Sequence, residues 1–368
     1  MAKNKEKESV TFAPSSSDEA DVESKIHKST KLPEPTKSTH KDLGLSDDDV
    51  IEMYDLMYLQ RRFEERAMQM YQKGKYGGFL HLYMGQEAIS TGTVYALNDD
   101  DDIVTAYRDH GFGLARGVTA KEGMAELYGK ATGCSKGKGG SMHFAKAENH
   151  FWGGYGIVGA HIPVGAGLAF ANKYNENNRI ATCFIGDGAV NQGALHETFN
   201  MSKLWQLPVA FVVENNGYAM GTSVRRHGVG ELYERAKGFD IKHDVINGMD
   251  VFTVLEKMRE IAEDIRKNSE PWFLEIRTYR YRGHSMSDPE TYRTKEELQE
   301  YKKIDPIERM HTYIVDNEIA TKEELDKIDD DVEQEVLDAI DFAEESDFPD
   351  LDDLYKHVFV EDDYPFHK

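Results

Sequence analysis

An acidic residue between two glycines follows a short apolar run near the middle of the chain. Gly186, Asp187 and Gly188 come directly after residues 180–185, a run that is typical of a strand buried on both faces. In open α/β sheets, ligands bind beyond the carboxyl ends of such strands. The glycines permit a sharp turn and close approach to a ligand, and a helix start after them favours phosphate. The tripeptide alone is common in turns, so a second signal is needed.

The second signal lies at the end of the next apolar run, residues 208–213. Asn215 and Asn216 follow this run, and Tyr218 comes two residues later. If the two runs are parallel neighbours, Asp187 and Asn216 emerge at the same edge of the sheet. A carboxylate, an amide oxygen and an exposed carbonyl such as that of Tyr218 suit a Mg²⁺ ion that bridges to a diphosphate. The alternative is an ordinary acidic cap and an Asn-Gly turn, and the two strand ends together favour the metal site.

Helices and strands alternate around these motifs. A helix-like segment over residues 191–205 connects the two runs, a long amphipathic helix is expected over 250–266, and another strand over 272–279. This order predicts an α/β fold, a mostly parallel sheet with helices on both faces. A Rossmann dehydrogenase is disfavoured because no GxGxxG pattern opens a helix after a strand.

Both ends of the chain differ from this central region. Residues 1–45 are polar and rich in Lys, Glu, Ser, Thr and Pro, which predicts a disordered tail. The main domain is expected over 46–310, starting with a helix that is capped by Ser46 and ends near Gly74.

An acidic helical extension is expected over 311–368. Thr321 and Glu324 form a capping box in this extension, and apolar residues continue after them at helical spacing. We interpret its acidic face as a solvated surface, with a docking surface for a basic partner as the alternative.

Composition excludes several classes of protein. The 368 residues include 44 basic and 67 acidic side chains, for a net charge of -23, the opposite sign to that of most nucleic-acid binders. No apolar run approaches the roughly 20 residues of a membrane span. The two cysteines, Cys134 and Cys183, fit a reducing compartment. No apolar signal region or Arg-rich presequence is found at the N-terminus, so we expect a cytoplasmic protein.

Five further segments accompany the two strand-end motifs: His81–Glu87, Thr105–Arg108, Gly137–His143, Gly156–Ala160 and Gly283–Pro289. Together with Gly186–Gly188 and Asn215–Asn216, this combination resembles the thiamine diphosphate-dependent 2-oxo acid dehydrogenase alpha family. The resemblance extends over about residues 50–310. It implies a thiamine diphosphate-binding fold of the diphosphate type with N- and C-terminal helical extensions.

The resemblance implies roles at matching positions only. Mg²⁺ would be bound by Asp187, Asn216 and the carbonyl of Tyr218. Thiamine diphosphate would be bound by Tyr107, Arg108, Gly156, Val158, Asp187, Gly188, Ala189, Asn216, Tyr218 and His284. His81 and His284 would lie at the active-site channel as proton donors or acceptors. A lone histidine is otherwise more often a satisfied structural residue.

The resemblance also implies a reaction and partners. The family decarboxylates a 2-oxo acid and reductively acylates the lipoyl group of a separate acyltransferase. This chain has the length of one of the two domains that hold the cofactor, which implies a beta subunit with the activating glutamate, in an α₂β₂ assembly. Pyruvate is favoured as substrate by residues 220–224 and 279–289. The alternatives are a branched-chain 2-oxo acid, acetoin, or, in a different class, a non-catalytic nucleotide-binding α/β protein.

Three smaller features complete the expectations. Residues 137–140 lack the P-loop pattern and are interpreted as a flexible loop over the site. The small residues between Gly159 and Ala169 suggest a tightly packed helix, at a subunit contact or within the chain. Ser285 and Ser223 match phosphorylated serines of mitochondrial relatives, but no presequence is evident, so we do not expect regulation by a kinase. Arg282 replaces a histidine of those relatives.

Overall fold

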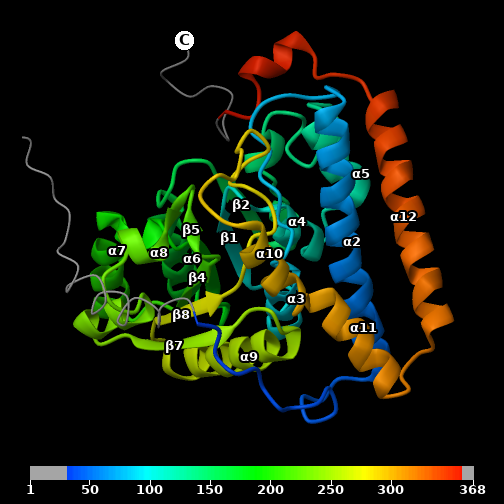
Figure 1. The fold of residues 1–368 in the computed structure, drawn as a ribbon. Helices are drawn as coiled ribbons and strands as arrows, with labels where there is room; N and C mark the ends of the chain where they lie inside the picture. Colours follow the sequence, from blue (N-terminus) through cyan, green and yellow to red (C-terminus); the bar gives the residue numbers. More distant parts are fainter. Residues whose placement is uncertain (1–30, 359–368) are drawn as a thin grey trace, which may run out of the picture.

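A six-stranded sheet forms the centre of the part of the chain that the structure describes. The computed structural model describes residues 31–358. The sheet has the order β2-β1-β3-β4-β8-β7, and its neighbouring strands are parallel. Its strands are β1 (Asp102–Ala106), β2 (Phe151–Tyr155), β3 (Ala181–Gly186), β4 (Val209–Asn215), β7 (Lys242–Asn247) and β8 (Trp272–Arg277). The predicted α/β fold class is confirmed (Figure 1).

The strands β3 and β4 lie in the middle of the sheet and are the two apolar runs of the sequence. Alternate side chains of β3 enter different hydrophobic cores: Phe184 packs on one face of the sheet, and Cys183 and Ile185 pack on the other. The register of the pair aligns Gly186 with Glu214. The residues that follow both strands therefore emerge at the same edge of the sheet, as the sequence predicts.

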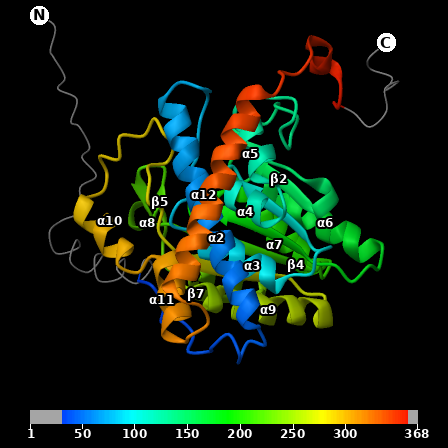
Figure 2. The same cartoon turned by 90° about the vertical axis from the view of Figure 1, so that its right-hand side faces the viewer.

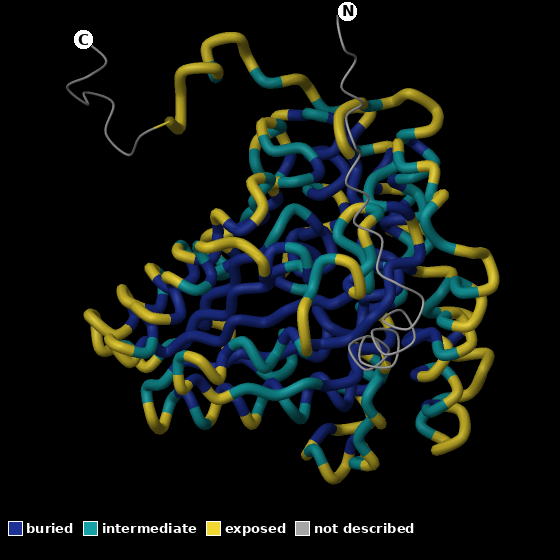
Figure 3. Tube along the Cα trace, turned by 60° about the vertical axis from the view of Figure 1, so that its left-hand side comes forward, coloured by how far each residue is buried: buried dark blue, intermediate teal, exposed yellow. Residues whose placement is uncertain are grey.

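Helices cover both faces of this sheet (Figures 1 and 2). On one face, α6 (His161–Tyr174) and α7 (Gly193–Leu204) bury Ala166 and Phe199 against the strands. On the other face, α9 (Val251–Asn268) contributes Met258 and Ile261 to the larger core. Figure 3 shows the sheet as a continuous buried layer between these helices.

The N- and C-terminal helices pack together on one side of the sheet. In Figure 2, α12 (Lys322–Glu345) crosses in front of α2 (Asp47–Gln72), and its residues also contact α5 (Ala120–Leu127). Val336 of α12 is part of the main core, and Glu333 forms an ion pair with Arg62 of α2. The remaining α-helices and the small sheet are α3 (Glu87–Ala96), α4 (His110–Ala115), α8 (Val224–His227), α10 (Lys295–Lys302), α11 (Pro306–Asp316), β5 (Tyr218–Ala219) and β6 (Thr222–Ser223).

The predicted helix ends of α2 and α12 are confirmed. Ser46 caps α2 in a reciprocal capping box with Asp49, and Thr321 caps α12 in the same way with Glu324. Gly74 follows α2 with a φ of 71°, a left-handed conformation that glycine adopts without steric cost.

Part of the predicted N-terminal tail is ordered. Residues 1–30 lie outside the described residues, but 31–45 pack against the body of the protein. The backbone N–H of Thr36 donates to Oγ1 of Thr253 at 2.8 Å, and Nδ1 of His40 lies 2.7 Å from the hydroxyl of Tyr313. The expectation of a disordered tail is therefore wrong for 31–45. The divisions at 46–310 and 311–368 stay predictions, and residues 359–368 also lie outside the described part.

Candidate active site

A cavity of about 340 Å³ lies at the carboxyl ends of β3 and β4, the place where ligands bind in open α/β sheets. Nine of the predicted site residues line it: Tyr107, Arg108, Val158, Asp187, Gly188, Ala189, Asn216, Tyr218 and His284. Of the other two, His81 packs against Tyr107 behind this lining, with the ring centroids 4.7 Å apart. Gly156 is also outside the lining and lies beside the His143 ring.

Two buried arginines give the cavity its charge. Arg108 donates to the carbonyl oxygens of Leu82 at 2.6 Å and His284 at 2.8 Å. Arg280 was not predicted as a site residue, and it donates to the carbonyl oxygens of Tyr218 and Met220. Burial, and then the charge of Arg280, lowers the pKa of Arg108 to about 10.

The hydrogen-bond acceptors that the structure gives these two guanidiniums within residues 31–358 are all neutral: Leu82, Asn216, Tyr218, Met220, Arg282 and His284 supply oxygens, as does the hydroxyl of Tyr292. Buried cations are stable when anions compensate them. Two guanidiniums with neutral acceptors therefore make this cavity a suitable site for an anion such as a diphosphate.

Two of the three predicted metal ligands converge on one point. Nη1 of Arg280 lies 3.1 Å from the carbonyl oxygen of Tyr218 and 3.4 Å from Oδ1 of Asn216. The amide of Asn216 is oriented by Gln86, whose Oε1 accepts from Nδ2 of Asn216 at 3.1 Å. Asp187 lines the same cavity. The donor set thus combines a carboxylate, an amide oxygen and a carbonyl oxygen, which fits Mg²⁺.

The third predicted ligand has a partner that sequence reasoning missed. Oδ2 of Asp187 lies 3.0 Å from Nε2 of His227, and Nδ1 of that histidine lies 3.0 Å from the amide of Asn191. His227 is therefore held between two groups, and its ring faces the carboxylate. In the sequence His227 lies within the basic stretch of residues 225–227, which gave no indication that it approaches Asp187.

The two glycines of the Gly-Asp-Gly motif were expected to permit a sharp turn and close approach to a ligand, and the structure gives them a different role. Neither Gly186 nor Gly188 has a positive φ, so no left-handed turn requires them. A Cβ atom at Gly188 would lie 2.6 Å from Cβ of Ala219, so it is close approach that requires glycine there. The helix α7 also begins only at Gly193, after a 3₁₀ turn over Ala189–Asn191. The helix expected over 191–205 is therefore present and begins two residues later than expected.

The two predicted catalytic histidines lie together. The rings of His81 and His284 are 5.1 Å apart and edge to face, and both pack against Tyr107. Burial, followed by the charge of Arg108, lowers the pKa of His81 to about 2 and that of His284 to about 4. Both are neutral near pH 7. Nδ1 of each ring has no hydrogen-bond partner within the described residues.

Glu214 is a further cavity residue without a predicted role. Its carboxylate accepts from the hydroxyl of Tyr83 at 2.6 Å, and burial raises its pKa to about 7. Glu214 directly precedes the Asn215-Asn216 pair, so the sequence indicates that it lies near the site. The sequence does not indicate that Glu214 is buried against Tyr83, because the two residues are 131 positions apart.

The loop of residues 137–140 is held in place. The buried carboxylate of Glu126 accepts four backbone N–H groups, from Ser135 and Gly137 at 2.8 Å, Gly139 at 2.7 Å and Gly140 at 3.0 Å. A carboxylate with four such bonds fixes a loop strongly. The expectation of a flexible loop is therefore wrong, and Glu126 is the residue that sequence reasoning missed.

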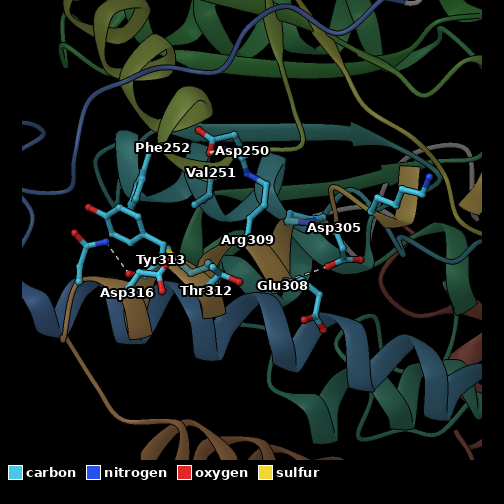
Figure 4. Close-up of a pocket in the computed structure, with 13 residues that line it drawn as sticks. Asp250, Val251, Phe252, Asp305, Glu308, Arg309, Thr312, Tyr313 and Asp316 are labelled. Atoms are coloured by element: carbon cyan, nitrogen blue, oxygen red, sulfur yellow. Dashed lines mark hydrogen bonds and ion pairs between the residues drawn. The ribbon is translucent and has the colours of Figure 1, made fainter. Parts of the chain in front are cut away.

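A second cavity, of about 380 Å³, lies between the start of α9 and α11 (Figure 4). Arg309 of α11 points toward Asp250 and forms an ion pair with it at 2.7 Å, and Asp250 also caps α9. Asp305 caps α11 and accepts from Arg61. These charged groups serve helix ends and ion pairs, so the cavity at β3 and β4 is the stronger candidate.

Comparisons with known proteins agree on one family. The sequence model of the family described as "Dehydrogenase E1 component" matches residues 55–352. The pyruvate dehydrogenase E1 component subunit alpha of Rickettsia bellii (strain RML369-C) is 48% identical over 314 residues, which cover 85% of this chain and 96% of the relative. The protein of the same name from Rhizobium meliloti (strain 1021) is 48% identical, covering 86% and 91%. The mitochondrial protein of Dictyostelium discoideum is 47% identical, covering 86% and 83%.

Proposed function

Because the chain belongs to the dehydrogenase E1 component family, we propose that it is the alpha subunit of a pyruvate dehydrogenase that transfers acetyl groups. The relatives named above all carry this name, which favours pyruvate over branched-chain 2-oxo acids and acetoin. The observation that carries the assignment is the pair of buried arginines, Arg108 and Arg280, beside the ends of β3 and β4. A non-catalytic scaffold protein has no need of two such cations in a cavity.

Thiamine diphosphate fits this cavity. Its diphosphate would lie against Arg108, Gly188 and Ala189, since the hydrogen-bond acceptors that the described residues give Arg108 are neutral carbonyl oxygens. When bound, this cofactor supplies a nucleophilic carbon and an electron sink for the decarboxylation of a 2-oxo acid. The chain's own part is to bind and orient the cofactor and substrate and to exclude water.

Magnesium fits the same edge of the sheet. The ligands would be Asp187, Asn216 and the carbonyl oxygen of Tyr218. Support comes from the shared contact of Asn216 and Tyr218 with one nitrogen of Arg280, since this contact shows that both oxygens face the same part of the cavity.

His81 and His284 would handle protons at the channel. Each is a neutral imidazole with an unpaired Nδ1, so each has a ring nitrogen available to a bound substrate or intermediate. Arg108 donates to the backbone of His284 and of Leu82, next to His81. One arginine therefore orients both histidine segments and the anion.

A beta subunit would complete the site. On α6, on α7 and at the residue that follows α7, five apolar side chains are exposed: Phe170, Tyr174, Met201, Leu204 and Trp205. An exposed patch of this kind marks a protein interface. Val158, at the cavity, is also 45% exposed. We expect the beta chain to cover these surfaces, to supply the activating glutamate and to form an α₂β₂ assembly, with the lipoyl domain of an acyltransferase as acceptor.

The proposed location of the protein rests on its relatives. Within residues 31–358, no helix has the length and apolar character needed to cross a bilayer. Bacterial relatives such as that of Rhizobium meliloti are consistent with a cytoplasmic location, which we propose here.

Reconstitution tests the proposed function. The chain is purified alone and with a beta chain, and pyruvate-dependent acetylation of a lipoyl domain is measured with thiamine diphosphate and Mg²⁺. We expect turnover only with the beta chain, and pyruvate to exceed branched-chain 2-oxo acids and acetoin. Full activity of the single chain, or a preference for another substrate, would contradict the assignment.

A further inference from the structure

Side chains hold the backbone around His81. The N–H of His81 donates to Oγ of Ser141 at 3.1 Å, and the N–H of Tyr83 donates to Oε1 of Glu64 at 2.6 Å. Between them, the carbonyl oxygen of Leu82 accepts from Arg108. Buried backbone groups need partners, and here the partners come from polar side chains outside any strand.

Ser141 and Glu64 are joined by one buried histidine. Nδ1 of His110 lies 2.9 and 3.0 Å from the two carboxylate oxygens of Glu64. Its Nε2 lies 3.0 Å from both the carbonyl oxygen and Oγ of Ser141. A carboxylate and a carbonyl oxygen only accept hydrogen bonds, so both ring nitrogens carry a proton. His110 is therefore an imidazolium that forms an ion pair with Glu64.

The direction of the pKa shift of this histidine agrees with its geometry. Burial lowers the pKa of His110, but the Glu64 carboxylate, Asp109 and the Ser141 carbonyl together raise it by more, so the net shift is upward. Both side chains are almost completely buried. A buried ion pair with all its polar atoms bonded is rigid, since breaking it would leave an unpaired charge in the core.

Ser141 is fixed from its other side as well. It directly follows Gly140, the last of the four backbone N–H groups that Glu126 binds. The position of the Ser141 hydroxyl is thus set by Glu126 and by the His110–Glu64 pair, independently of His81.

We propose that Ser141, held by the His110–Glu64 ion pair, is a positioning residue that sets the place of His81 in the active site. The catalytic part of this inference rests on the proposed function, since His81 acts only if the cavity performs the reaction. The structural part does not: among residues 31–358 the His81 N–H has one acceptor, and Ser141 supplies it.

Substitution of Ser141 tests the catalytic part. In the holoenzyme with its beta chain, Ser141→Ala leaves the His81 N–H without an acceptor, and we expect kcat for pyruvate to fall about tenfold. Binding of thiamine diphosphate and Mg²⁺ should change less than about twofold, because Ser141 does not line the cavity. Ser202→Ala is the matched control: Ser202 is buried in α7 and its hydroxyl has no partner within the described residues. An unchanged kcat in Ser141→Ala would overturn the proposal.

A double-mutant cycle separates positioning from a general structural role. If Ser141 acts through His81, Ser141→Ala should have no further effect on kcat in a His81→Ala background. Equal losses in both backgrounds would show that Ser141 acts elsewhere, and would also overturn the proposal.

Hydrogen exchange tests the structural part of the proposal without a measurement of turnover. In Ser141→Ala, but not in Ser202→Ala, we expect faster exchange in a peptide covering residues 79–84. Unchanged exchange there overturns the structural part. If the wild-type holoenzyme fails to turn over pyruvate, the proposed function is wrong, while the exchange result still decides whether Ser141 holds the His81 segment.

Discussion

Nη1 of Arg280 donates a hydrogen bond to the carbonyl oxygen of Tyr218 at 3.1 Å. That oxygen is one of the three groups expected to bind Mg²⁺, so a protein cation lies beside the predicted metal ligands. The same guanidinium bonds the carbonyl oxygen of Met220 and the hydroxyl of Tyr292. Arg280 therefore connects the loop after β4 to the segment that carries His284.

Removal of this charge should weaken cofactor binding. In Arg280→Gln, the cavity loses one of its two buried guanidiniums. We expect the affinity for thiamine diphosphate in the presence of Mg²⁺ to fall about 10- to 100-fold, the usual effect of losing charge-assisted hydrogen bonds. Calorimetric titration of the reconstituted complex measures this. Arg309→Gln, on α11 at the second cavity, is the control and should bind thiamine diphosphate normally. Equal affinities of Arg280→Gln and wild type for the cofactor would contradict the proposal that this cavity binds an anion.

The metal assignment has its own test at Asp187. Asp187→Ala removes the carboxylate of the predicted ligand set, so Mg²⁺-dependent binding of thiamine diphosphate should be lost, as measured by calorimetry with and without the metal. Asp341→Ala, at an exposed position of α12, controls for the loss of one negative charge. If Asp187→Ala binds the cofactor as well as its parent does, the ion lies elsewhere.

Gly188 allows a test of shape rather than charge. An added methyl group would lie 2.6 Å from Cβ of Ala219, so Gly188→Ala must displace the loop after β4 or the motif itself. We expect a loss of cofactor affinity of at least about tenfold, with an overpacking cost of about 1–3 kcal/mol in the free energy of unfolding. Gly238→Ala is the control, since a Cβ there meets open space at a φ that is not positive. Normal binding of the cofactor by Gly188→Ala would show that the site tolerates a methyl group at this position.

Much of the central fold could be predicted from the sequence because β3 and β4 are apolar runs and β8 is apolar apart from Glu275 and Arg277. The edge strand β7 was missed because Lys242, His243 and Asp244 interrupt its pattern, and β1 and β2 were missed because they are short. Residues 31–45 were assigned to the tail because their composition is polar. These residues are ordered because they contact Thr253 and Tyr313, which are more than 200 positions away. The local sequence pattern carries no information about such contacts.

At the site, too, some residues could be predicted from local sequence pattern and others depend on contacts between distant residues. Asp187 and Asn216 were predictable because each directly follows a strand, and parallel neighbours end at one edge. Arg280 and Gln86 act through partners that are distant in the sequence, so their residue types alone carried no specific signal. Glu126 acts on a loop 9 to 14 positions away, but its residue type does not show that its carboxylate is buried against that loop. Arg280 falls within residues 279–289, which favoured pyruvate as substrate but assigned no role to Arg280 itself.

The stability of the chain should depend on pH through His161. Its Nε2 lies 2.8 Å from the carbonyl oxygen of Phe184, and burial lowers its pKa to about 4, below the value of about 6.5 in an unfolded chain. Between these values only the unfolded chain binds the proton, so stability is complete above about pH 6.5 and falls as the pH drops toward 4. The loss should reach about 2 kcal/mol near pH 4.5.

His161→Gln checks this dependence, because glutamine can donate to the same carbonyl oxygen without titrating. Urea unfolding of the cofactor-free chain at pH 7.5 and 4.5 gives the free energy of unfolding for both proteins. We expect wild type to lose about 2 kcal/mol more than His161→Gln over this interval. Parallel losses in the two proteins would show that His161 does not contribute to the acid sensitivity.

The exposed apolar patch on α6 and α7 predicts where the beta chain binds. Phe170 packs against Trp205 with the two rings tilted and their centroids 5.9 Å apart, and both rings remain about half exposed. Phe170→Glu places a charge in this patch without disturbing the core, so the chain should keep its melting temperature but fail to co-elute with the beta chain. Val315→Glu, on the outer side of α11, is the control and should assemble normally. Co-elution of Phe170→Glu with the beta chain at wild-type affinity would move the interface away from α6, because a buried, unpaired carboxylate at a subunit contact costs several kcal/mol.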